Sequence, residues 1–133
     1  MDKRKCALLG TIGPVIAYVF IGISIALSPW FSWSNNALSD LGHSVKSGVA
    51  PVFNLGLLLT GFTILVYAVT ALKKHSRYTS ICLSASAFLL QSIATFNEAY
   101  GFLHYAVSVL FFVSLGVALI VYAIERKYPL AVA

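Results

Sequence analysis

Long apolar runs alternate with short polar stretches along the whole of this 133-residue chain. Each run is long enough, or nearly so, to cross a hydrocarbon core of about 30 Å as a helix that rises about 1.5 Å per residue. Backbone groups inside a bilayer must satisfy their own hydrogen bonds, which favours helices. The pattern therefore predicts an all-α, polytopic membrane protein, a bundle of four transmembrane helices in one membrane domain, with spans at about 6–28, 51–72, 79–96 and 103–124.

Composition supports a membrane protein. Hydrophobic residues make up 59% of the chain and charged residues 10%, whereas about 25% of the residues of a soluble domain are charged. The formal net charge is +5, but the basic residues form short clusters beside the apolar runs and do not line one face of an element. This distribution argues against a nucleic-acid partner and is typical of topology signals.

The positions of Lys and Arg predict the orientation. Three lie before the first run, three in the connection at 72–79 and two after the fourth run, while Lys46 is alone on the opposite side. By the positive-inside rule, we expect a multi-pass protein of the cell membrane with both termini in the cytoplasm. Small residues one turn apart, Gly13 with Ala17 and Ser80 with Ser84, predict close contacts between the helices.

The long connection between the first two runs contains a polar segment, WSNNALSDLGHS, at residues 33–44. We expect a short interfacial helix that begins near Asn36, a good N-cap, and ends near Gly42, a good C-terminal stop. At about 100° per residue, one face would carry the polar side chains and the other would turn leucines toward lipid. The polar face comprises Asn36, Ser39 and Asp40, joined by His43 if the turn continues past Gly42, and the apolar face Ala37, Leu38 and Leu41.

The second connection on that side adds further polar groups at the same predicted level of the membrane. Glu98 ends the third run and His104 begins the fourth. Gln91 lies seven residues before Glu98, hence on the same helical face, and Asn54 lies in the first turn of the second span. Amides are costly in lipid unless they are hydrogen-bonded, so we expect both to face the interior of the bundle.

Asp40, His43, Glu98 and His104 are the candidate catalytic residues, and Asn36, Ser39, Asn54 and Gln91 the candidate binding residues. One interpretation is that these groups only cap helix ends and tie loops. A second is a ligand, metal or catalytic site, because ionisable groups near a membrane commonly have a function. A third is a subunit interface.

Three segments together resemble a known family. They are NALSDLG at 36–42, PVFNLG at 51–56 and FNEAYGFLH at 96–104. In this order they resemble an uncharacterised, mostly archaeal membrane family, domain of unknown function 998. The resemblance implies a small helical membrane protein without an established activity, whose signature residues here are Asn36, Ser39, Asp40 and His104. Members of that family are often longer, so the resemblance leaves two expectations for this short chain: a minimal version of the family, or a chain that assembles with itself as a homo-oligomer.

Two functions remain open. The first is a binding or assembly protein whose partners are membrane lipids. The second is a membrane-embedded hydrolase of lipid-like substrates, with zinc held by the four candidate catalytic residues. It is distantly similar to the zinc-dependent ceramidase and adiponectin-receptor group, but has two outer histidines in place of three. A metal-free version would use Ser39 as nucleophile and His104 or His43 as base.

Overall fold

The computed structural model describes residues 2–127 and contains four long α-helices within that range. All four are long and apolar enough to cross a membrane, which confirms the predicted all-α, four-helix membrane fold. No strand occurs in the described part of the chain. The α-helices are α1 (Lys3–Ala26), α2 (Ala50–Thr70), α3 (Arg77–Thr95) and α4 (Phe102–Lys127), and three short 3₁₀-helices lie between them: η1 (Leu38–Gly42), η2 (Leu72–Lys74) and η3 (Glu98–Tyr100).

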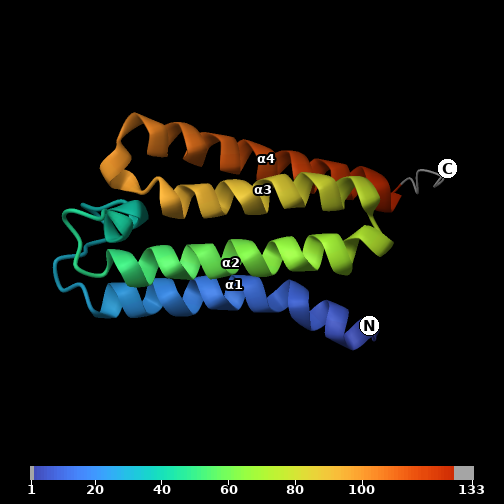
Figure 1. Ribbon diagram of the computed structural model, residues 1–133, viewed down its shortest axis with the longest axis horizontal. Coiled ribbons are helices and arrows are strands. Elements are labelled where there is room, and N and C mark those ends of the chain that lie inside the picture. The colour runs from blue at the N-terminus through green and yellow to red at the C-terminus, as the bar shows by residue number, and fades with distance from the viewer. Residues whose placement is uncertain (1, 128–133) are drawn as a thin grey trace.

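The long helices pack in chain order. Helix α1 packs on α2, α2 on α3, and α3 on α4, so that they lie side by side as a row in Figure 1. Within residues 2–127 no packing of similar extent joins α1 to α4. Accordingly α2 and α3 bury a larger share of their residues than α1 and α4 do. The outer helices keep large apolar side chains exposed, as helices that face lipid would.

Small residues bring neighbouring helices together. At the predicted contact position Gly13, an added Cβ would lie 2.8 Å from Cγ1 of Ile64 on α2. Ser80 joins α3 to α2, because its hydroxyl donates to the carbonyl of Ala68 at 2.7 Å. The Ser84 hydroxyl bonds only within its own helix, to the Ser80 carbonyl. Close packing of small residues thus fixes the distance between α1, α2 and α3.

The bundle has two different ends. At the terminal end, α1 begins, α4 ends and η2 connects α2 to α3 (Figure 1). At the loop end lie the connections at 27–49 and 96–101, with η1 and η3.

A carboxylate that the sequence did not point to fastens the terminal end. Glu125 of α4 accepts hydrogen bonds from the backbone N–H of Tyr78 at 2.9 Å, the backbone N–H of Thr79 at 2.8 Å and the Thr79 hydroxyl. It therefore caps the first turn of α3 from another helix.

Candidate functional site

The polar segment of the first connection folds into a tight turn that Asp40 closes. Its Oδ2 accepts hydrogen bonds from the backbone N–H of Ala37 at 3.0 Å and from Nδ2 of Asn36 at 3.1 Å. Asn36 in turn accepts from the backbone N–H of Ser32 at 3.0 Å. The segment forms the 3₁₀-helix η1, which ends at Gly42 as predicted, but its N-cap position is Ala37 and not the predicted Asn36. The physical reason is local, because the Asp40 carboxylate bonds back to an N–H that lies before the turn.

The apolar side of η1 faces protein. Leu41 has no exposed surface and Gly42 is buried, so the expectation that Leu41 points toward lipid is wrong. Nδ2 of Asn54, on α2, donates to the Gly42 carbonyl at 2.9 Å. The turn is thereby held against α2 at the loop end of the bundle.

His43 is bonded to its own loop. Its Nδ1 accepts from the backbone N–H groups of Val45 and Lys46, each at 3.3 Å. These long bonds close the turn that follows η1, so Nδ1 is not available to a ligand. The structure gives His43 the role of a loop tie.

Asn97 joins the two connections, and the sequence analysis did not single it out. Its Oδ1 accepts from the backbone N–H of Ala99 at 3.1 Å and from that of Ser44 at 3.2 Å. The first bond caps η3 and the second holds the first connection beside it. An asparagine directly before a turn is a capping signal that could have pointed to the first bond, but nothing local indicates the second.

His104 has a defined tautomer. Its Nδ1 lies 2.8 Å from the carbonyl oxygen of Phe96, and a carbonyl can only accept, so Nδ1 carries the proton. In the neutral ring, Nε2 then has a free lone pair, with the Ser108 hydroxyl 3.5 Å away. At that distance the contact is weak.

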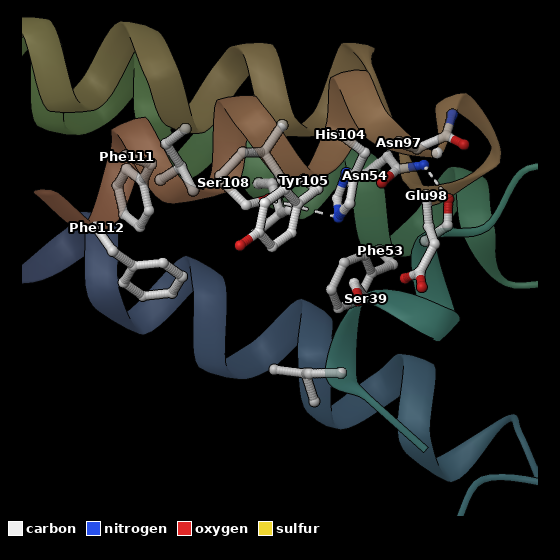
Figure 2. A pocket seen from close by; sticks show the side chains of 16 residues that line it. Ser39, Phe53, Asn54, Asn97, Glu98, His104, Tyr105, Ser108, Phe111 and Phe112 are labelled. Atoms are coloured by element: carbon white, nitrogen blue, oxygen red, sulfur yellow. Dashed lines mark hydrogen bonds between the residues drawn. The ribbon is translucent and has the colours of Figure 1, made fainter.

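These elements enclose a cavity of about 580 Å³ at the loop end, between η1, the start of α2, the end of α3, η3 and α4. Figure 2 shows Asn54, Glu98 and His104 toward one end of it and Phe111 and Phe112 toward the other. Its apolar residues include Phe53, Leu57, Leu90, Ile93, Phe111 and Phe112, and its polar residues are Ser39, Asn54, Asn97, Glu98, His104, Tyr105 and Ser108.

The cavity collects half of the predicted site residues. Ser39, Asn54, Glu98 and His104 line it. Asn36, Asp40 and His43 support the loop from outside the lining, as described above. Gln91 does not line it either: its Nε2 donates to the Ala87 carbonyl at 3.3 Å, and its Cγ would lie 2.6 Å from a Cβ added to Gly61 of α2.

Among the described residues that line the cavity, Glu98 is the only acid, and none is Lys or Arg. Its Oε2 is buried and has no hydrogen-bond partner within residues 2–127. The cavity therefore combines a long apolar wall with an unpaired carboxylate oxygen and the basic nitrogen of His104.

The described residues do not fit the zinc site of the hydrolase hypothesis. No group of three His, Cys, Asp or Glu residues in residues 2–127 is placed to hold a metal ion. Asp40 bonds through Oδ2 and His43 through Nδ1 to backbone N–H groups, and neither residue lines the cavity, which leaves Glu98 and His104 there. A catalytic zinc site takes three protein ligands.

Comparison with known proteins identifies a family. The model of a family described as "Protein of unknown function (DUF998)" matches residues 11–132, nearly the whole chain. No curated protein matches the chain, and no solved structure does.

Proposed function

The chain belongs to the DUF998 family, and from this premise we propose that it is a membrane protein that binds an amphipathic, lipid-like molecule in the cavity at the loop end. The apolar part of the ligand lies against Phe111 and Phe112. Its polar head lies near Asn54, Glu98 and His104.

The observation that carries this proposal is that one cavity combines an apolar wall with a few polar side chains. A volume of about 580 Å³ is within the range of about 300–1,000 Å³ that small-molecule sites usually have. Such sites join an apolar wall to a few polar groups that orient the ligand. The unpartnered Oε2 of Glu98 adds a reason for a ligand with a hydrogen-bond donor, because a buried acceptor without a partner is costly.

The distribution of Lys and Arg supports an orientation for this site. With both termini in the cytoplasm of a cell, the loop end faces outward. The cavity then opens at the level of the outer headgroups, and its ligand comes from the outer leaflet or from outside the cell.

Retention of lipid by the purified protein tests the proposal. Native mass spectrometry of protein extracted in mild detergent should find a bound amphiphile. Phe111→Ala should reduce its retention by at least about fivefold, because a packed tail loses its contacts with the ring. Phe88→Ala is the matched control, since Phe88 is 66% exposed and does not line the cavity. Equal retention in both variants would refute the site.

A metal-free hydrolase is the second candidate. The contact between Ser108 and His104 favours Ser108 as its nucleophile in place of Ser39. The Nε2 lone pair of His104 could accept the proton of the Ser108 hydroxyl when that oxygen attacks an ester or amide. Hydrolysis of lipid-like esters by the wild type, lost in Ser108→Ala while ligand retention persists, would support this function. Retention without turnover in the wild type would exclude it.

A further inference from the structure

A second cavity, of about 290 Å³, lies at the terminal end of the bundle. It is formed by the start of α1, the end of α2, the connection to α3 and the last turns of α4. Its apolar lining comes from Cys6, Ala7, Ala71 and Leu72. Its polar lining carries hydrogen-bond donors throughout and comprises Tyr67, His75, Ser76, Tyr122 and Arg126.

Ser76 is an unsatisfied donor in this lining. It precedes α3 at the N-cap position, where a serine hydroxyl ordinarily accepts from an N–H of the first turn. Glu125 already occupies the N–H groups of Tyr78 and Thr79. The Ser76 side chain therefore makes no capping bond: the residue is 3% exposed, and its buried hydroxyl has no partner in the described chain.

The charged side chain in the lining of this cavity is basic, whereas the one in the lining of the cavity at the loop end is acidic. Within residues 2–127 no carboxylate lines the cavity at the terminal end, and Arg126, which is exposed, has no hydrogen bond or ion pair to another described residue. Glu125, the residue before Arg126, is engaged by the first turn of α3. Lys73, Lys74 and Arg77 are exposed on the adjoining connection and add positive potential.

We propose that this cavity binds a phosphate group, with Arg126 supplying charge, His75 a ring N–H donor, and Ser76, Tyr67 and Tyr122 hydroxyl donors. Basic pockets between transmembrane helices on the cytoplasmic side are suited to anionic headgroups. Arginine fits phosphate oxygens particularly well, because its planar guanidinium donates in a fork. The phosphate can belong to an anionic lipid or to a soluble phosphate compound, which the same donors would recognise. The proposal does not depend on the function of the cavity at the loop end.

Binding measurements on the full-length protein in nanodiscs test this site. One arm uses phosphatidylglycerol titrated into phosphatidylcholine nanodiscs, and the other adds inorganic phosphate to phosphatidylcholine nanodiscs. At about 0.15 M salt, Arg126→Gln should weaken binding roughly tenfold, since the variant loses the charge-assisted hydrogen bonds of the guanidinium. Ser76→Ala should weaken it about threefold or more without lowering thermal stability, because the hydroxyl makes no bond that the protein would lose.

Arg77→Gln is the matched control. It removes the same charge from the same end of the protein, and Arg77 is exposed like Arg126 but does not line the cavity. A larger loss in Arg126→Gln than in Arg77→Gln, together with a loss in Ser76→Ala, supports the site, and the arm that responds identifies the source of the phosphate. Equal losses in the two arginine variants with no effect of Ser76→Ala would mean diffuse attraction to a basic surface, and would overturn the proposal.

Discussion

Replacement of Gly42 by alanine tests how the first connection is held over the cavity at the loop end. A Cβ at this position would lie 2.7 Å from Oδ1 of Asn54 and 2.8 Å from Cδ1 of Phe53. Carbon atoms pack favourably at about 3.5–4.0 Å, so η1 or the two side chains must move by roughly 1 Å. Neither side chain is free to move, because Phe53 is 5% exposed and Asn54 is bonded to the Gly42 carbonyl.

Three contributions set the expected loss of stability. Overpacking of a tight contact costs about 1–3 kcal/mol. Loss of the bond between Asn54 and Gly42 adds about 1 kcal/mol. The backbone opposes these terms by about 0.4–1 kcal/mol, since Gly42 has no positive φ and alanine restricts the unfolded chain. We expect Gly42→Ala to lower the free energy of unfolding by about 1–3.5 kcal/mol.

Reversible unfolding by SDS in mixed micelles measures this difference, and native mass spectrometry measures lipid retention on the same samples. Gly48→Ala is the control, because Gly48 lies in the same connection and a Cβ there would meet no atom within 4 Å. Gly42→Ala should lose both stability and ligand, whereas Gly48→Ala should lose neither. If both variants match the wild type in unfolding and in retention, the close approach of η1 to α2 does not hold the cavity together.

Two further predictions concern the terminal end and the orientation. Glu125→Ala should lower the free energy of unfolding by about 1–2 kcal/mol, as the first turn of α3 loses its acceptors. The control is Asp2→Ala, which removes a carboxylate that makes no capping bond and should leave SDS unfolding unchanged. Equal unfolding of the two variants would contradict the capping role. A cysteine at Lys46, in a chain whose Cys6 and Cys82 are replaced by alanine, should react with a membrane-impermeant maleimide in intact cells; labelling only after the cells are opened would reverse the orientation.

The helices could be predicted because each corresponds to a run of consecutive apolar residues. Run length and charge placement identified all four, and the observed helices begin and end within a few residues of the predicted spans. Contact positions were partly predictable as well. Gly13 and Ser80 do join helices, whereas the close approach of Gly56 to Phe20 depends on how α1 and α2 are aligned.

The directions of polar side chains were much less predictable. Asp40 and His43 suggested ligands by residue type, but both bond to backbone N–H groups within their own loop. Gly42 looked like a helix stop, yet it has no left-handed backbone, and its lack of a side chain is needed for contact with α2. Glu125 looked like one more charge at a helix end. Its role depends on contact with α3, where its partner Thr79 lies 46 residues before it in the sequence. No local sequence pattern indicates such a pairing.

The row of helices also has a consequence for how the protein assembles. Each long helix packs on its neighbour in the chain, so each major interface can form as soon as the next helix enters the membrane, with little loop entropy to overcome. Two hydrogen-bonded links span much longer stretches of sequence: Asn97 to Ser44, 53 residues apart, and Glu125 to Thr79, 46 residues apart. Their loops are the costliest to close, so we expect them to form last. One link lies beside each cavity, and the two binding sites would therefore be completed only after the helices have docked.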